Sequence, residues 1–355
     1  MTSFKKHWLH LAHIRVVLLF LTLFIGCSSV QTDPEDPVNP VEPRRLTELV
    51  ARIEAGEVID EQLPAGVFVF DAAILLRNRT SLSGVGQGET ILEIRAQDAG
   101  AALRFIGSDE MTLADLTIRY SGDDFADVIS VQNGIATLRN VDVTGGKSVV
   151  EENDDDTGRP FTVFFGRGVL FQNESQGIVQ DSRLRDNESV GINFFDNSTG
   201  TVRNSLSEGN LHGIALSRNS RATLEGNTLR NNTEAGIVFL GDATGTVRNN
   251  LSEGNGISGI ELVDSSQATL EGNTLRNNES SGIVFSGDAT GTVRNNLSEG
   301  NAIHGIFLTG NSQATLEDNI LRNNTRYGIA IRENANATLR DNQFSGNGEG
   351  EVLRE

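Results

Sequence analysis

The chain has 355 residues, of which 22% are charged, and its net charge at pH 7 is −19. Such an acidic protein is unsuited to binding nucleic acid or an anionic membrane surface, so we expect no nucleic-acid partner. Its single cysteine excludes disulfides within the chain and metal sites built from several thiolates.

The first 26 residues have the pattern of an export signal. Three basic residues precede an apolar run from Val16 to Ile25, which is too short to cross a bilayer as a stable helix. The sequence LFIGC at the end of this run resembles the lipobox of bacterial lipoproteins. That resemblance implies cleavage after Gly26 and acylation of Cys27, which would attach the protein to a membrane through its lipid. An ordinary signal peptide with an incidental cysteine is the alternative.

The same resemblance implies where the lipoprotein is held. Ser28, rather than an aspartate, follows the cysteine, and this implies an outer-membrane lipoprotein that faces either the periplasm or the exterior. Loss of the signal removes three positive charges and no negative ones, so the net charge moves from −19 to −22. Residues 27–45 contain four of the six prolines and are predicted to form an extended tether.

A folded domain is predicted over residues 46–355. It begins with Leu46, Leu49, Val50 and Ile53, whose helical spacing between charged residues predicts a short amphipathic helix. We expect this helix to cap the N-terminal end of a solenoid, since terminal coils expose apolar core and unpaired strand edges.

Residues 168–350 repeat with a period of about 23 residues. In each unit a glycine precedes a branched apolar residue, and a second apolar residue follows two positions later, which is the period of a β-strand. A short strand at such an interval is typical of a solenoid, in which each unit buries its face against the next. The apolar pairs are Val169 and Phe171, Ile192 and Phe194, Ile214 and Leu216, Ile237 and Phe239, Ile260 and Leu262, Ile283 and Phe285, Ile306 and Leu308, and Ile329 and Ile331.

Two columns of asparagine recur with the same period. Asparagine tolerates the left-handed backbone of a sharp corner, and its amide can bond the identical amide in the next coil. We therefore predict two stacked ladders at the corners, each rung stabilising the fold by about 1 kcal/mol. The first column is Asn204, Asn227, Asn250, Asn273, Asn296, Asn319 and Asn342, and the second is Asn187, Asn210, Asn232, Asn255, Asn278, Asn301, Asn324 and Asn347.

Three short strands and two asparagine corners in 23 residues describe one coil of a single-stranded parallel β-helix, an all-β fold that we expect to have about eleven coils. Coils that carry TGTVRNNLSEGN alternate with coils that carry QATLEGNTLRNN or a close variant, so a pair of coils was duplicated in tandem. The alternative is a leucine-rich repeat, because Leu270, Asn273 and Leu275 fit its core motif. However, the units lack its leading leucines and any segment with helical spacing.

Residues 63–92 resemble the opening coil of the pectate-lyase-like superfamily, also called pectin lyase-like. The resemblance implies a right-handed β-helix, and with the repeats it covers nearly everything after the tether. The superfamily includes lyases, glycoside hydrolases, epimerases, adhesins and copper-maturation proteins, so the resemblance indicates the fold more than an activity. The matching positions are Pro64, Gly66, Phe68, Ile74, Leu82, Gly84, Gly86, Thr90, Ile91 and Leu92.

An acidic loop is predicted within residues 146–164. The echo of Ala136 comes about 41 residues later, at Gly177, which leaves some 18 residues beyond one coil. By resemblance, loops that leave the turns of this fold wall its substrate groove, and family lyases use a calcium-bound acidic cluster with a basic residue as the base. The candidate calcium ligands are Asp123, Asp124, Asp154, Asp155 and Asp156, and the candidate bases are Lys147, Arg159 and Arg167. A solvated acidic loop without calcium is the alternative.

Two other sets of side chains carry less specific signals. His212 and His304 occupy one column, too far apart for a single site, and are predicted to be solvent-facing turn residues, so a catalytic triad is not expected. Outward threonines form a stripe that resembles the ice-binding face of some solenoids, but Arg221, Gln267 and Gln313 interrupt its second row, and threonine is common on exposed strands. The stripe is Thr201, Thr223, Thr246, Thr269, Thr292, Thr315 and Thr338, with Thr199, Thr244 and Thr290 beside it.

The leading functional hypothesis is a non-catalytic module of the cell envelope that binds polysaccharide or acts as a scaffold. It depends on the nearly identical coils, because a catalytic centre needs unlike residues converging on one point. The alternative is a polysaccharide lyase or glycoside hydrolase that acts on an acidic glycan near the 146–164 loop.

Overall fold

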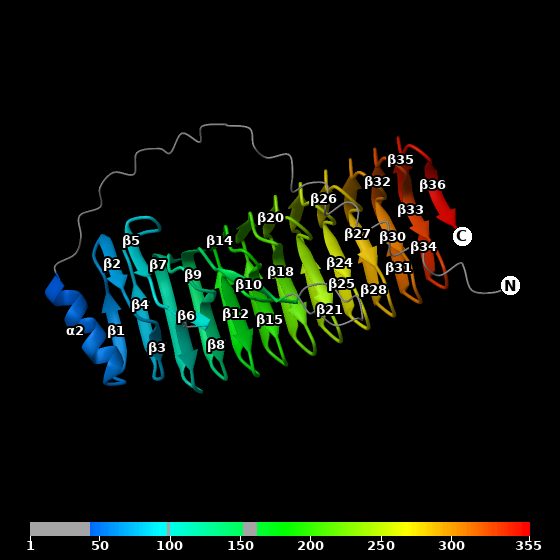
Figure 1. Cartoon of the computed structure of the whole chain (residues 1–355). Helices are drawn as coiled ribbons and strands as arrows, with labels where there is room; N and C mark the ends of the chain where they lie inside the picture. The colour runs from blue at the N-terminus through cyan, green and yellow to red at the C-terminus, as the bar shows by residue number, and fades with distance from the viewer. Residues whose placement is uncertain (1–42, 98–99, 152–161) are drawn as a thin grey trace. The chain divides into compact units, whose positions relative to one another are not determined.

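The computed structural model describes residues 43–97, 100–151 and 162–355, and it is a parallel β-helix. The signal, Cys27, most of the tether, Asp154 to Asp156 and Arg159 lie outside these residues. Each coil contributes one strand to each of three parallel sheets (Figure 1), which we call sheets 1, 2 and 3 in the order in which the chain enters them. β7 and β9 are long enough to belong to both sheet 1 and sheet 2.

Sheet 1 contains the first strand of every coil. Its strands are β1 (Ile59–Gln62), β4 (Thr80–Ser83), β7 (Glu110–Tyr120), β9 (Ile135–Thr144), β13 (Gln176–Gln180), β16 (Thr199–Arg203), β19 (Arg221–Glu225), β22 (Thr244–Arg248), β25 (Gln267–Glu271), β28 (Thr290–Arg294), β31 (Gln313–Glu317) and β34 (Asn336–Arg340).

Sheet 2 contains the second strand of every coil, including the second halves of β7 and β9. Its other strands are β2 (Gly66–Phe70), β5 (Thr90–Ile94), β14 (Arg183–Arg185), β17 (Leu206–Glu208), β20 (Thr228–Arg230), β23 (Leu251–Glu253), β26 (Thr274–Arg276), β29 (Leu297–Glu299), β32 (Ile320–Arg322) and β35 (Gln343–Ser345).

Sheet 3 contains the third strand of every coil. Its strands are β3 (Ile74–Leu76), β6 (Gly100–Ile106), β8 (Ala126–Gln132), β12 (Val169–Gln172), β15 (Val190–Phe195), β18 (His212–Ser217), β21 (Ile237–Leu240), β24 (Ile260–Leu262), β27 (Ile283–Phe285), β30 (Ile306–Leu308), β33 (Tyr327–Ile331) and β36 (Gly350–Arg354).

The described residues thus form twelve coils, one more than the sequence predicted. The stretch 63–92, which the sequence suggested as one opening coil, contains the end of the coil β1–β3 and the beginning of the coil β4–β6. The leucine-rich repeat alternative is wrong, because residues 168–350 contain strands and turns and no helix.

A helix stands at the N-terminal end of the coils, as predicted (Figure 1). α2 (Pro43–Glu54) begins three residues earlier than its apolar spacing indicated. Leu49 is buried in the core, and Val50 and Ile53 pack against it, so the helix covers apolar side chains of the first coil. No helix in the described part of the chain has the length and apolar character needed to span a membrane.

Large and small side chains alternate in the core. Phe239 on sheet 3 is followed six residues later by Gly245 on sheet 1, where an added Cβ would lie 2.8 Å from the phenylalanine ring. In the next coil Leu262 is followed at the same interval by Ala268, and both are buried. The pair Phe285 and Gly291 then repeats the first combination. The two kinds of coil therefore fill the interior with complementary volumes.

The second asparagine column forms the predicted ladder. The Nδ2 of Asn232 donates to Oδ1 of Asn255 at 3.0 Å, and Asn255 donates to Asn278 at the same distance. The same oxygen of Asn255 also accepts the backbone N–H of Asn232 at 3.1 Å, and its Nδ2 reaches the carbonyl of Leu229 at 3.2 Å. Every rung from Asn187 to Asn347 is linked in this way, so the buried amides are satisfied.

The first column is also a ladder from Asn227 to Asn342, but Asn204 is not part of it. Ser205 occupies the ladder position, and its backbone N–H donates to Oδ1 of Asn227 at 3.0 Å. The prediction was wrong because Arg203 pairs with Glu225, so this coil is one residue shorter than a constant spacing of 23 assumes.

The sequence analysis predicted that the ladder asparagine adopts the left-handed conformation at the corner. That prediction was wrong, because the residue before it adopts this conformation. Asn249 and Gly272 have φ of 55° and 64°, whereas the ladder residues Asn250 and Asn273 that follow them do not have positive φ. In each Asn-Asn or Gly-Asn pair, the first residue turns the chain and the second forms the amide ladder.

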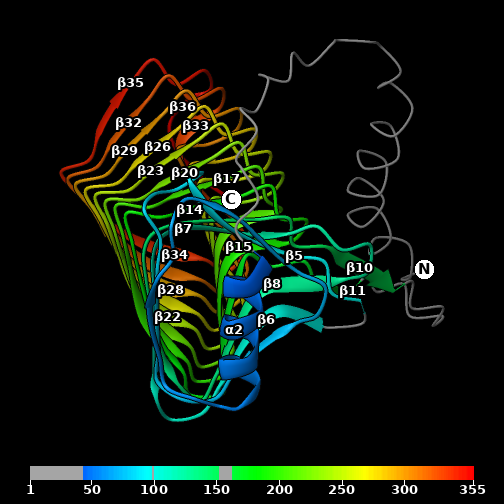
Figure 2. The same cartoon turned by 90° about the vertical axis from the view of Figure 1, so that its left-hand side faces the viewer.

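An antiparallel hairpin is inserted where the acidic loop was predicted. β10 (Ser148–Glu151) pairs with β11 (Thr162–Phe165), and the hairpin projects from the coils between β9 and β12 (Figure 2). Gly177 pairs with Ala136 as the sequence predicted, so the stack keeps its register across the insertion.

Candidate functional site

Alternating charges line the end of the strands in sheet 1. The last outward residues there are, coil after coil, Arg203, Glu225, Arg248, Glu271 and Arg294. Glu225 lies 3.2 Å from Arg203 and 2.8 Å from Arg248, while Arg294 lies 3.1 Å from Glu271. The hydrogen bond from Arg248 lowers the pKa of the Glu225 carboxyl, so this row consists of ion pairs.

Sheet 2 carries a second row in the opposite phase. A coil that places arginine in sheet 1 places glutamate in sheet 2, so Glu253 lies 2.6 Å from Arg276 of the next coil. Arg230 pairs with Glu208 at 2.8 Å, and Arg322 pairs with Glu299 at 2.6 Å. The alternation of two coil types is therefore also an alternation of charge, and stacking two coils of the same type would juxtapose like charges in both sheets.

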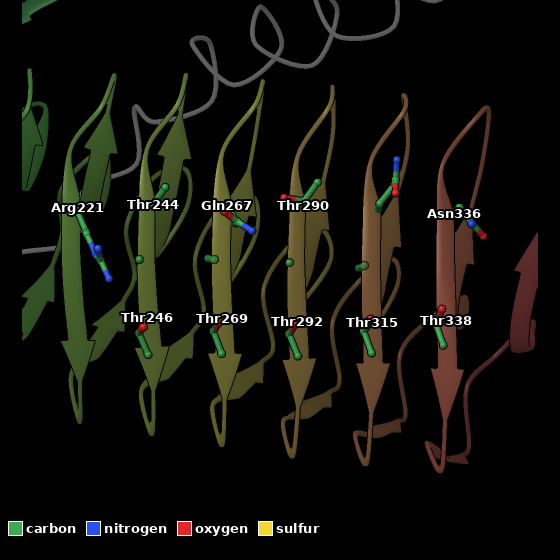
Figure 3. Close-up of a pocket in the computed structure, with 15 residues that line it drawn as sticks. Arg221, Thr244, Thr246, Gln267, Thr269, Thr290, Thr292, Thr315, Asn336 and Thr338 are labelled. Carbon is green, nitrogen blue, oxygen red and sulfur yellow. The ribbon is translucent and has the colours of Figure 1, made fainter.

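A surface depression lies on the outer face of sheet 1 between these charges and the preceding corner. It has a volume of about 580 Å³ and extends over the strands from β19 to β34. Figure 3 shows its two rows of side chains on adjacent strands. We call this depression the sheet 1 groove. Its residues are Arg221, Thr244, Gly245, Thr246, Gln267, Ala268, Thr269, Thr290, Gly291, Thr292, Gln313, Ala314, Thr315, Asn336 and Thr338.

The threonine stripe forms one row of this groove. Thr246 pairs in register with Thr269, and Thr269 with Thr292, so their side chains recur at every coil as the sequence predicted. The second row alternates in kind, because Thr244 and Thr290 flank Gln267. The glutamines that interrupt the threonine array are thus themselves part of the groove.

The polar side chains of the groove have no hydrogen-bond partners within the described part of the protein. None of its threonine hydroxyls, side-chain amides or the Arg221 guanidinium makes a side-chain hydrogen bond there, whereas the ladder asparagines and the charged rows are bonded to one another. Threonine hydroxyls and glutamine amides each donate and accept hydrogen bonds. The groove therefore offers an extended set of donors and acceptors to a ligand or to water.

The predicted calcium cluster is not assembled by the described residues. The Asp123 side chain is fully exposed and lies 3.8 Å from the Nζ of Lys147, and the backbone carbonyl of Asp124 accepts a hydrogen bond from the Tyr120 hydroxyl at 2.8 Å. No group of three or more His, Cys, Asp or Glu side chains in the described ranges has metal-binding geometry. Since the other three candidate ligands lie outside those ranges, a calcium site at this loop stays a prediction.

The structure shows a buried acid near the hairpin that the sequence did not single out. The Asp127 side chain is only 3% exposed, lies 3.2 Å from Nη1 of Arg167 and accepts the Arg167 backbone N–H at 3.0 Å. Burial raises the pKa of the Asp127 carboxyl, and the Arg167 guanidinium opposes that rise. Arg167, a predicted base, is thus engaged in an ion pair. Asp127 was missed because the acidic runs on either side of it drew the prediction.

The two histidines lie in the same column but in different surroundings. His212 Nε2 lies 3.0 Å from Glu234. His304 is 3% exposed, so the prediction that it faces solvent was wrong. Its ring centroid lies 5.4 Å from that of Phe307 and 6.0 Å from that of Tyr327, and its Nδ1 accepts the Tyr327 backbone N–H at 3.3 Å. These aromatic neighbours come from adjacent strands, which a column of single residues does not reveal.

The family model of the right handed beta helix region matches residues 81–275 and 212–353. The solved structures that are similar to this chain include the following three. Periplasmic alginate epimerase AlgG has a TM-score of 0.61 at 15% identity, over 86% of this chain and 89% of that chain. The A-module of Azotobacter vinelandii mannuronan C-5 epimerase AlgE4 has 0.61 at 17%, over 90% and 96%. The catalytic domain of a GH87 alpha-1,3-glucanase, with nigerose, has 0.65 at 16%, over 92% and 68%. At these identities the likeness concerns the fold. No curated protein matches the sequence.

Proposed function

We propose, from the premise that this chain belongs to the right-handed β-helix family, that it binds an extended polysaccharide along the sheet 1 groove without cleaving it. The observation that carries this proposal is the row of unpartnered hydroxyls and amides, repeated in register over strands β19 to β34. Such groups hydrogen-bond the hydroxyls of sugars as well as they bond water. The similar structures include an alginate epimerase, a mannuronan epimerase and a glucanase, so this fold accommodates polysaccharides elsewhere.

The absence of cleavage is proposed from the repetition of the groove. Thr246, Thr269 and Thr292 occur in nearly identical surroundings, and the only charged residue in the groove, Arg221, lies at one end. Most glycoside hydrolases use a pair of carboxyl groups at the scissile bond, and the family lyases use an acidic cluster beside a base. The groove lining contains no carboxyl group, so the described groove is suited to holding a chain rather than cutting it.

Replacing two threonines by valine tests where the ligand binds. Thr246→Val with Thr292→Val keeps the branched shape of both side chains and removes two hydroxyls from the groove. If both hydroxyls bond the glycan, the loss is about 1 to 3 kcal/mol, or roughly 5- to 150-fold in affinity. The matched control is Thr228→Val with Thr274→Val on the outer face of sheet 2, which should leave the affinity unchanged.

The measurement is binding of the purified domain to a panel of soluble polysaccharides, followed by analysis of the products. We expect binding that the groove variant weakens and the control does not, with no new chain ends. Failure to bind any member of the panel would refute the proposal, and so would equal affinities of the two variants.

A polysaccharide-acting enzyme near the hairpin is the second candidate, and the buried Asp127 favours it. An acid with a raised pKa near an inserted loop is typical of a catalytic carboxyl, although buried ion pairs also occur for structural reasons. New unsaturated or reducing ends on incubation with uronate-containing glycans, with and without calcium, would establish this activity. Loss of those products in Asp127→Asn would assign them to the hairpin region.

We also propose that the protein is exported and held at the outer membrane by a lipid on Cys27. The support is the basic, apolar and LFIGC pattern of the N-terminus. Fractionation of expressing cells, with mass spectrometry of the N-terminal peptide, tests this proposal. Cys27→Ala should release the protein from the membrane fraction, and an unmodified cysteine in the wild-type protein would contradict it.

A further inference from the structure

The charges around the sheet 1 groove limit what it can hold. Within the groove the charged side chain is Arg221, and the remaining lining residues are threonine, glutamine, asparagine, glycine or alanine. On the side where the strands end, the Arg248 and Glu271 row alternates in sign and consists of ion pairs, so its net charge nearly cancels along the groove. This edge offers no continuous positive surface to an acidic polymer.

The opposite edge of the groove is negative over strands β22 to β28, and its basic residues, Arg218 before β19 and Arg332 before β34, lie at the two ends. Asp242, Asp264 and Asp288 lie two or three residues before strands β22, β25 and β28, and all three are exposed. Asp264 accepts the backbone N–H of Gly241 at 2.9 Å, and Asp288 accepts the side-chain amide of Asn311 at 2.9 Å, so both are held at the corner without a cation. A uronate polymer along the strand stack would pass a carboxylate in three successive coils, which disfavours it electrostatically.

The side chains of the groove repeat along the axis of the stack with a defined spacing. Thr244, Gln267, Thr290 and Gln313 repeat every second coil, and two coils span about 9.6 Å because neighbouring strands are about 4.8 Å apart. This is comparable to the length of one disaccharide in an extended 1,4-linked glycan. A glycan along the stack would meet the same pair of side chains once per disaccharide.

We infer that the occupant of the groove is an uncharged, extended 1,4-linked glycan that lies along the axis of the stack, with one disaccharide for every two coils. This inference rests on the proposed polysaccharide binding and specifies its ligand class. The three aspartates disfavour an acidic glycan. The amides and hydroxyls of the groove donate hydrogen bonds to sugar hydroxyls and also accept hydrogen bonds from them.

Calorimetric titration with two matched series tests the inference. The probes are cello-oligosaccharides and β-1,4-linked mannuronate oligosaccharides of two, four and six sugars, at 0.15 M NaCl. We expect the neutral hexasaccharide to bind at least tenfold more tightly than the acidic one, and its affinity to rise at each added disaccharide. Tighter binding of the mannuronate series would overturn the inference, and so would a neutral series whose affinity does not depend on length.

A variant separates charge from the rest of the groove. Asp242→Asn, Asp264→Asn and Asp288→Asn together keep side chains of the same size and remove three negative charges. We expect the affinity for mannuronate hexasaccharide to rise at least fivefold, with little change for cellohexaose. If neither series binds to wild-type protein, the inference fails. The panel of polysaccharides then shows whether polysaccharide binding itself also fails.

Discussion

Removing one coil should destabilise this protein more than removing two. Deletion of residues 236–258 removes one coil and joins Ala235 to Gly259, whereas deletion of 236–281 removes two and joins Ala235 to Gly282. Both junctions keep the strands and both asparagine ladders in register, because the ladder residues recur at the same spacing. The shorter deletion, however, stacks two coils of the same type.

The structure shows which charged side chains the one-coil deletion brings together. The one-coil deletion places Glu225 over Glu271 and Arg230 over Arg276, and it removes the intervening Arg248 and Glu253. The deletion therefore replaces ion pairs with like-charge contacts in both sheets, and this exchange destabilises the one-coil variant.

The interior adds to this cost. Leu229 and Leu275 would become direct neighbours in sheet 2, where buried Ser252 now separates them. Overpacking of this kind costs about 1 to 3 kcal/mol. We expect this overpacking and the like-charge contacts together to exceed the roughly 1 to 3 kcal/mol that an average coil of this length contributes.

Urea unfolding followed by circular dichroism measures the difference. We expect the one-coil variant to have the lower free energy of unfolding, and 1 M NaCl to narrow the gap by screening the like charges. Glu225→Gln with Arg230→Gln in the one-coil variant should recover part of the loss. A one-coil variant at least as stable as the two-coil variant would refute the role assigned to the alternation.

Four further predictions concern individual side chains. Phe239→Ala should lower the free energy of unfolding by about 3 to 5 kcal/mol through a core cavity. Gly245→Ala should cost about 1 to 3 kcal/mol, and Phe239→Leu should recover part of that loss, so a double-mutant cycle should show coupling. Asn255→Leu should cost about 3 kcal/mol or more, because it leaves amides and a carbonyl of adjacent coils unpaired, and an unchanged unfolding midpoint would contradict the ladder. Burial and nearby arginines lower the pKa of His304 from 6.5 to about 4, so its contribution to stability should be complete above pH 6.5 and decline as the pH falls toward 4. His304→Gln should reduce that decline in the free energy of unfolding, measured by urea unfolding at each pH. An unaltered pH profile would exclude this contribution of His304.

The fold could be predicted from the sequence because each coil repeats the same local signals. In every unit, the glycine before Ile237 or Ile260 marks a strand, and the asparagine at 232 or 255 marks a ladder position next to a corner. Prediction failed where one residue shifts the phase. Asn204 was placed in a ladder because constant spacing hides a shorter coil. The sequence also left open which residue of the second strand points inward, and the structure shows buried Ser252 alternating with buried Leu275.

The candidate site was only partly predictable for a different reason. The threonine stripe could be read from the spacing of Thr246 and Thr269, but the groove depends on which polar groups lack partners once the chain is folded. The same applies to Asp127, because its burial and its pairing with Arg167 join residues from different strands. Hydrogen bonds and ion pairs between coils form only in the folded stack, so the sequence of a single repeat does not reveal them.

The inserted hairpin shows that this architecture separates the length of its excursions from the integrity of its stack. The chain leaves at Lys147 and returns at Gly166, and the next coil still joins its predecessor as though nothing intervened. Corners of this kind are natural points for gaining new recognition segments during evolution. They are equally suited to grafting a foreign peptide, which would be displayed on a rigid support whose folding does not depend on the guest.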